Sequence, residues 1–227
     1  MSTPVISNGG INFSLKSGSQ WTPEFVIPAE LLKLPAPLSF FHILRYLKTQ
    51  KRTGWLVRGV KQENAESISD HMYRMAVMCL LAPEEDELNS RKCAIIALVH
   101  DLAEALVGDL TPDDPVGPDE KHRRERETMA YLASTLKPVN EKASIVLFES
   151  YLEYEKQSSA EARFVKDLDK FEFLLQTVEY ERDVKEGIES NDVSLKDFMY
   201  AAKLIKSPLV KDWTEQLMNE RKTFVRD

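Results

Sequence analysis

The chain has 227 residues, of which 43% are hydrophobic and 30% charged, and its formal net charge is -7. This length suits one domain, because a single core grows to roughly 250 residues before chains tend to split. The composition is too apolar for a disordered chain. The excess of acid argues against a surface for nucleic-acid polymers, which bind through clustered Lys and Arg. No apolar run approaches the ~20 residues of a membrane-spanning helix, so we expect a soluble protein without a membrane partner.

The cysteines and the N-terminal composition indicate the compartment and the domain boundary. Cys79 and Cys93 lie in apolar, helix-like stretches, so we interpret them as reduced core residues of a cytoplasmic protein. The first ~25 residues are rich in Ser and Gly but lack the Arg content of a transit peptide. We therefore predict a flexible segment over residues 1–35 and a single domain over residues 36–227.

Apolar residues recur at intervals of three and four over most of the chain, which predicts helices. No alternating strand pattern of useful length accompanies them, so the predicted fold class is all-α, a helical bundle. The expected helices cover residues 38–47, 68–79, 91–107, 120–136, 141–155 and 164–178, and two terminal helices begin near residues 194 and 208.

Two of these helices carry polar residues where a core is expected. Ser67, followed three residues later by Asp70, is typical of a capping box, and it places His71 in the first turn of its helix. The stretch Arg91–Val107 is apolar nearly all round, which predicts a central, buried helix. Gly108 ends that stretch, and the following Pro- and Asp-rich segment predicts an irregular loop of the kind found at active sites.

His100, Asp101 and Glu104 interrupt the central apolar stretch at spacings that bring them to one spot on a helix. Burying such groups unpaired is costly, and a divalent cation would satisfy them. Together with His71 and Asp169 from two other helices they form a mixed nitrogen and oxygen set that suits Mn, Co, Fe, Mg or Zn. Each of these residues alone is weak evidence for a metal site, because a single buried His is more often hydrogen-bonded than metal-bound.

Other polar residues receive the ordinary structural interpretation. We assign no role to His42 or His122. The run Lys121–Glu127 predicts a solvated helix face, from which an Arg could reach a phosphate. Asp167, two residues before Asp169, points to another part of its helix and is predicted to be solvated.

Three segments occur in a fixed order: ESISDH at 66–71, ALVHDLAEALVGD at 97–109 and VKDLD at 165–169. They resemble the HD-domain superfamily of metal phosphohydrolases. Within it, residues 38–217 look like the HD domain-containing protein 2 family of eukaryotes, especially its yeast members, which is related to the bacterial 5'-deoxynucleotidases. Further similar markers are RTGW at 52–55, SDHMYRMAV at 69–77, KHRRE at 121–125 and QSSAEA at 157–162.

The resemblance implies an HD-domain bundle with a metal site at its centre. It implies that the ligands of the first metal are His71, His100, Asp101 and Asp169. It also implies that Glu104 and Asp109 form the catalytic side, and that they could hold a second cation with the Leu110 carbonyl. Family members remove the 5'-phosphate from deoxyribonucleoside 5'-monophosphates, work with Co, Mn or Mg, and form homodimers.

Arg52 and Trp55 are the expected substrate contacts, and here the sequence departs from the family pattern. The bacterial relatives place an Arg directly before a Trp, to contact phosphate and to crowd out a ribose 2'-hydroxyl. In this chain the Arg lies three residues before the Trp. Trp55 is therefore expected either to line the sugar pocket or to pack as an aromatic residue near a helix entry.

The predicted chemistry is hydrolysis of a phosphate monoester, in which a cation neutralises phosphoryl oxygens and supplies hydroxide near neutral pH. Glu104 would position or deprotonate the water, and Asp109 would hold a second cation or protonate the leaving oxygen. Two alternatives stay open at this point. One is hydrolysis of another phosphoester, such as a nucleoside triphosphate, a cyclic nucleotide or a guanosine tetraphosphate. The other is a non-catalytic helical module with a structural metal, which would close its coordination with protein ligands.

Overall fold

The structure is a computed structural model that describes residues 20–82 and 88–225. Within these ranges every regular element is a helix, which confirms the predicted all-α class, and the only extended pairing is one bridge between Lys51 and Ser67. None of the described helices is both long and apolar enough to cross a bilayer. The elements are η1 (Pro23–Phe25), α1 (Ala29–Leu32), α2 (Leu38–Thr49), α3 (Thr53–Val57), α4 (Ile68–Met78), η2 (Cys79–Leu81), α5 (Ser90–Val99), α6 (Glu104–Val107), α7 (Pro118–Leu136), α8 (Glu141–Lys156), α9 (Ala160–Glu186), η4 (Lys196–Leu204) and α10 (Pro208–Arg221).

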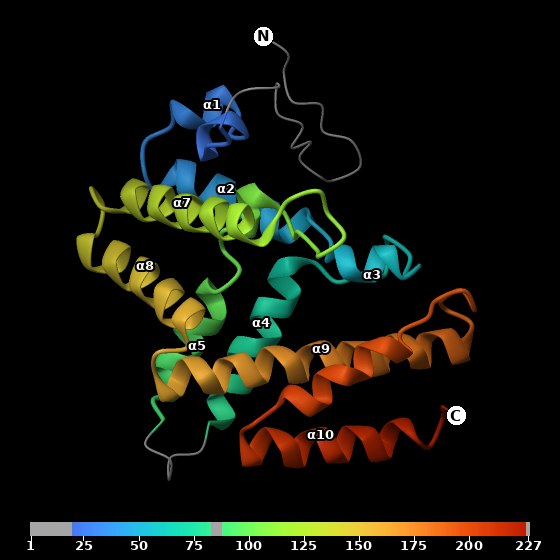
Figure 1. Ribbon diagram of the computed structural model, residues 1–227. Coiled ribbons are helices and arrows are strands. Elements are labelled where there is room, and N and C mark those ends of the chain that lie inside the picture. Colours follow the sequence, from blue (N-terminus) through green and yellow to red (C-terminus); the bar gives the residue numbers. More distant parts are fainter. Residues whose placement is uncertain (1–19, 83–87, 226–227) are drawn as a thin grey trace.

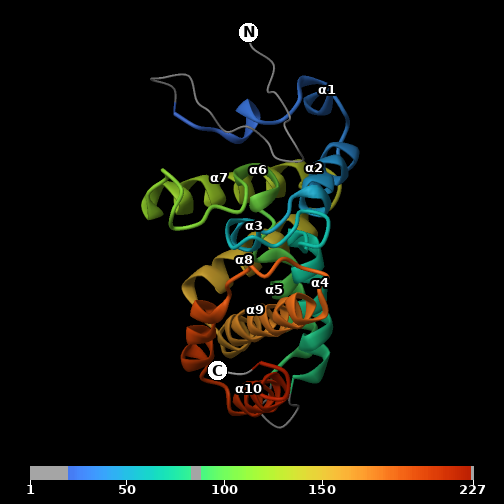
Figure 2. The ribbon, with the colours of Figure 1, turned by 90° about the vertical axis from the view of Figure 1, so that its right-hand side faces the viewer.

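The two largest apolar clusters of the described residues share α5 and its continuation. One cluster lies under α2, α6, α7 and α8, and the other joins α4, α5, α9 and α10. Figure 1 shows α10 running alongside α9, with α7 and α2 on the opposite side of the molecule. In the view turned by 90°, α9 and α10 are both seen nearly end-on, with α4 and α5 beside α9 (Figure 2). Cys79 and Cys93 are free thiols buried in the second cluster, as predicted.

The local start and stop signals act as the sequence indicates. The Ser67 hydroxyl accepts the Asp70 N–H, and the Asp70 carboxylate accepts the Ser67 N–H in return, so the predicted capping box opens α4. Gly108 ends α6 with a φ of 83°, a backbone conformation that residues with a Cβ rarely adopt. Because the capping box starts α4 at Ile68, His71 lies in the first turn of that helix.

The predicted single helix over residues 91–107 is wrong in its middle. α5 ends at Val99, and α6 begins only at Glu104. Between them the backbone tightens to bonds three residues apart, because the Leu102 N–H donates to the Val99 carbonyl and the Glu104 N–H to the Asp101 carbonyl. The polar triplet therefore lies at a break between two short helices, where its side chains face a cavity rather than the apolar core.

The packed region begins earlier than the predicted boundary at residue 36. Residues 1–19 of the expected flexible segment lie outside the described residues. Residues 20–35, in contrast, contain η1 and α1, and Trp21, Val26 and Ile27 are buried in the first apolar cluster. The large apolar surface of Trp21 explains why this segment packs.

The predicted solvation of Asp167 is also wrong. Its side chain is buried, and Oδ2 accepts the backbone N–H groups of Lys206 and Ser207 at 2.8 and 2.7 Å. The carboxylate thus fixes the segment between the two terminal helices against α9. Of those helices, η4 is a 3₁₀ helix, and α10 begins with Pro208 at its first position, as the Ser-Pro pair indicates.

Candidate metal centre

Four side chains from three separate parts of the chain converge on one buried point. His71 comes from the first turn of α4, His100 and Asp101 from the break after α5, and Asp169 from α9. The His71 Nε2 atom lies 3.4 Å from Asp169 Oδ1 and 3.9 Å from Asp101 Oδ2. The His100 Nε2 atom lies 3.1 Å from the same Asp101 oxygen. The structure therefore brings together the four residues that the sequence singles out as ligands.

Both imidazoles present the same nitrogen to this point. The Nδ1 atom of His100 lies 2.8 Å from the Ala97 carbonyl, which can only accept, so Nδ1 carries the proton and Nε2 is free to bind a cation. The Nδ1 atom of His71 contacts the Glu172 carboxylate. Among the described residues, neither Nε2 atom has a hydrogen-bond partner, although both are buried. Unpartnered buried nitrogens beside carboxylates fit a divalent cation.

The electrostatics of the cluster match this interpretation. Burial acts to raise the pKa of Asp101. The neighbouring His100 and Arg52 outweigh burial, so the pKa is lowered overall. Burial also acts to raise the pKa of Asp169, but Lys166 and His71 outweigh it and hold that pKa well below its usual range. Both carboxylates are thus ionised, as metal ligands have to be.

His71 behaves in the opposite way. Burial and Arg52 act to lower its pKa, but Glu172 and Asp169 outweigh them and raise the pKa of His71 to about 10. The surrounding carboxylates thus favour a positive charge at this point. A bound cation would supply that charge beside a neutral imidazole, because a histidine ligand must be neutral.

A polar cavity of about 300 Å³ is lined by three of the four candidate ligands, His100, Asp101 and Asp169. Glu104 lies in its wall with a buried Oε2 atom that has no hydrogen-bond partner among the described residues. Burial, with Asp101 and Asp109 nearby, raises the pKa of Glu104 well above its usual value. Such a carboxylate suits proton transfer close to the ligands.

The other two residues expected at a second cation already have protein partners. The Asp109 carboxylate accepts the Thr53 N–H at 2.6 Å. The Leu110 carbonyl accepts the Lys121 ammonium at 2.8 Å. A positive charge therefore already lies where the second cation would bind the Leu110 carbonyl, and a cation there would have to displace the ammonium.

The two expected substrate contacts lie in different places. Arg52 lines the cavity, and its Nη1 atom lies 3.3 Å from Asp101 Oδ2, so its guanidinium faces the centre despite the altered spacing. Trp55 does not line this cavity. Its ring is buried and stacks on Phe173 with centroids 5.0 Å apart, and its Nε1 donates to Glu66. The structure thus corrects the sugar-pocket prediction for Trp55 in favour of packing.

Sequence reasoning missed several residues that line the cavity or contact the candidate ligands, among them Lys121, Tyr154, Lys166 and Glu172. Lys166 donates to Asp169 at 2.9 Å and to the Tyr154 hydroxyl at 2.8 Å. Its spacing of three residues from Asp169 on a helix was the available signal. The cation that α7 contributes to the cavity is Lys121, whereas Arg123 pairs with Glu120 at 2.7 Å and does not line the cavity.

A second acidic group, Glu66 and Glu172, lies on the far side of the His71 ring. It has protein partners of its own. Glu66 accepts the Trp55 Nε1 at 2.8 Å, and Glu172 accepts the Arg74 Nε at 2.8 Å. We therefore place the cation on the Nε2 side of His71, and we interpret Glu172 as the group that orients its ring.

We expect Glu172→Gln to weaken the metal affinity of the purified protein by about 10- to 100-fold, as outer-shell substitutions do at other metal sites. The amide cannot accept both from His71 Nδ1 and from the Arg74 guanidinium with the strength of a carboxylate. Titration with a competing chelator measures the affinity. Glu179→Gln is the matched control, because Glu179 also pairs with Arg74, at 2.7 Å, but has no contact with His71. Equal affinities for the two variants would contradict the orienting role.

An all-α fold in which two imidazole nitrogens and two carboxylates face one buried point defines a protein built to hold a divalent metal ion. The HD domain family matches residues 44–210 of the chain. The chain belongs to this family.

Relatives extend the likeness over most of the chain. The 5'-deoxynucleotidase YGK1 of Saccharomyces cerevisiae is 46% identical over 90% of this chain and 94% of its own length. The human 5'-deoxynucleotidase HDDC2 is 43% identical over 83% of this chain and 87% of its own length. The solved structure of the HD domain-containing protein YGK1 superposes with a TM-score of 0.68 at 39% identity, covering 90% of this chain and 98% of that one. The resemblance read from the motifs is confirmed.

Proposed function

We propose that this chain is a metal-dependent 5'-deoxynucleotidase that hydrolyses deoxyribonucleoside 5'-monophosphates to a deoxynucleoside and phosphate. The observation that carries the proposal is the convergence of His71, His100, Asp101 and Asp169, with two unpartnered Nε2 atoms, beside a polar cavity. The relatives named 5'-deoxynucleotidase, which share most of the chain, support the substrate class.

In the proposed reaction the four ligands would hold a cation that neutralises phosphoryl oxygens and makes hydroxide available near neutral pH. Glu104 would orient the attacking water and accept its proton, since Glu104 lines the same cavity and its buried Oε2 atom has no hydrogen-bond partner among the described residues. Arg52, Lys121 and Lys166 line that cavity and would stabilise the negative charge of the phosphate. Asp109 would stiffen the wall through its bond to the Thr53 N–H and assist departure of the nucleoside oxygen.

A panel of nucleotides tests the substrate. We expect phosphate release from deoxyribonucleoside monophosphates, at least about tenfold faster than from ribonucleotides or from di- and triphosphates, a discrimination of about 1.4 kcal/mol. Phosphate detection together with chromatography of the nucleoside product measures it. If the protein instead cleaves a triphosphate or a cyclic nucleotide faster, its substrate is another phosphoester. No cleavage of any nucleotide by the metal-loaded protein would favour the non-catalytic module.

Removal of the metal should abolish activity, and Mn, Co or Mg should restore it. The mixed nitrogen and carboxylate set suits these cations. The measurement is the rate after chelation and dialysis, followed by titration with each metal. Elemental analysis of the protein as purified gives the number bound per chain. We propose one cation at the four ligands, and a second only if it displaces Lys121 from the Leu110 carbonyl. Full activity after complete removal of the metal would contradict the proposal.

A homodimer and a cytoplasmic location complete the proposal. The family resemblance supports the dimer, and the two reduced, buried cysteines support a reducing compartment. Light scattering of the purified protein measures the oligomeric state directly.

A further inference from the structure

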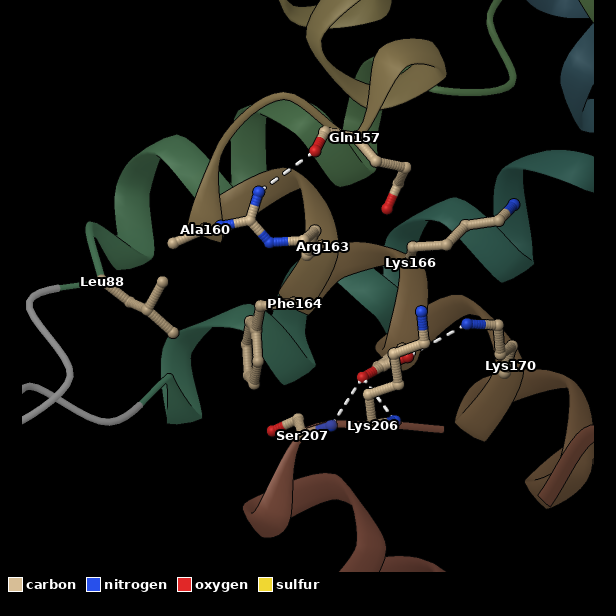
Figure 3. Close-up of a pocket in the computed structure, with 10 residues that line it drawn as sticks. Leu88, Gln157, Ala160, Arg163, Phe164, Lys166, Lys170, Lys206 and Ser207 are labelled. Atoms are coloured by element: carbon tan, nitrogen blue, oxygen red, sulfur yellow. Dashed lines mark hydrogen bonds and ion pairs between the residues drawn. The ribbon is translucent and has the colours of Figure 1, made fainter. Parts of the chain in front are cut away.

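A second cavity, distinct from the one at the candidate metal centre, opens between the first half of α9 and the start of α10 (Figure 3). Its volume is about 480 Å³, which lies in the range of pockets that hold small organic ligands. None of the four candidate metal ligands lines it. The chemistry of its wall therefore has to be explained separately.

Basic side chains dominate the charged part of this wall. Arg163, Lys166, Lys170 and Lys206 line the cavity, and Asp167 is the one acid among the described residues that line it. Asp167 is already engaged, since it accepts two backbone N–H groups and pairs with Lys170 at 3.0 Å. The Arg163 guanidinium, by contrast, donates to the Gln157 carbonyl at 3.2 Å and has no carboxylate partner among the described residues (Figure 3). In a chain with a formal net charge of -7, this local positive excess attracts an anion.

The wall also has an apolar part. Leu88, Ala160 and Phe164 line the same cavity, and Figure 3 shows Leu88 and Phe164 on one side of it, Lys170 and Lys206 on the other, and Arg163 above Phe164. A ligand that fits must carry a negative group at one end and an apolar or planar body at the other. We propose that this cavity binds a nucleotide or a similar organic phosphate, with its phosphate on Arg163 and Lys206 and its body against Phe164.

Lys166 connects this cavity with the metal centre, because it lines both. Its ammonium donates to the candidate ligand Asp169 and to the Tyr154 hydroxyl. A phosphate bound in the second cavity attracts the same ammonium and weakens its bond to Asp169. Occupancy of the second cavity therefore alters the rate of the first site without blocking it.

Titration of ATP onto the purified, metal-loaded, full-length protein, with magnesium in excess over ATP, tests the binding site. We expect Lys206→Glu and Arg163→Glu each to raise the Kd for ATP by about tenfold or more. Lys211→Glu is the matched control, an exposed lysine of α10 that does not line the cavity, and its Kd should stay within about twofold of the parent. Circular dichroism establishes that all three variants are folded, and two independent substitutions guard against the failure of one.

Kinetics with a deoxynucleoside monophosphate separates the two cavities. We expect saturating ATP to change the kcat of the parent by more than about twofold and to leave that of Lys206→Glu unchanged. Absence of ATP binding, equal Kd values for the parent and both cavity variants, or displacement of ATP by the substrate would overturn the site. ATP that binds without changing kcat would overturn the connection through Lys166. The ATP titration measures binding to the second cavity even if the substrate proposed for the metal centre is wrong.

Discussion

Asp101→Ala is expected to lower the hydrolysis of deoxynucleoside monophosphates by a factor on the order of a thousand or more. Its Oδ2 atom is the common neighbour of both histidines, at 3.1 Å from His100 Nε2 and 3.9 Å from His71 Nε2. The same oxygen accepts from Arg52 at 3.3 Å. Its removal takes a negative charge from the cation and leaves the guanidinium free to repel that cation.

The rate constant for phosphate release and the metal content by elemental analysis measure this loss together. We expect both to fall. Asp113→Ala is the matched control, because Asp113 is an exposed loop residue that does not line the cavity, and it should stay within about twofold of the parent. If Asp101→Ala retains activity within a few-fold of the parent, the metal mechanism is wrong.

Glu104→Gln is expected to lower kcat by about 100- to 10,000-fold while the protein keeps its metal. Glutamine has nearly the same shape, so the packing of α6 around this buried position is preserved. It cannot accept a proton from water, whereas an ionised carboxylate can. The loss should therefore appear in kcat rather than in the metal affinity.

Metal content, the unfolding midpoint and kcat separate catalysis from structure. Glu149→Gln, at an exposed position on α8, serves as the control and should leave all three unchanged. A Glu104→Gln protein with normal metal content and full kcat would remove Glu104 from the reaction. A protein that loses metal as well would instead assign Glu104 to the ligand set.

The sequence by itself determined the residue types of the centre and their helical setting. A buried helix that carries His-Asp and then Glu requires a partner for those groups, because unpaired polar groups in a core are costly. The motifs around His71, His100 and Asp169 supplied the family, which the comparisons confirm. The capping box and the terminal glycine were likewise readable, because each acts within a few residues.

Only the tertiary structure decided which groups from different helices meet. Helical periodicity defines a face on one helix, but contact across helices depends on how the helices pack. That packing sets Lys121 on the Leu110 carbonyl and Glu172 on His71 Nδ1. It also puts Trp55 into an aromatic cluster instead of the cavity and buries Asp167 against the entry to α10. The break at residues 100–103, which turns the polar triplet toward the cavity, follows from the same cause, since its local sequence is that of an uninterrupted helix.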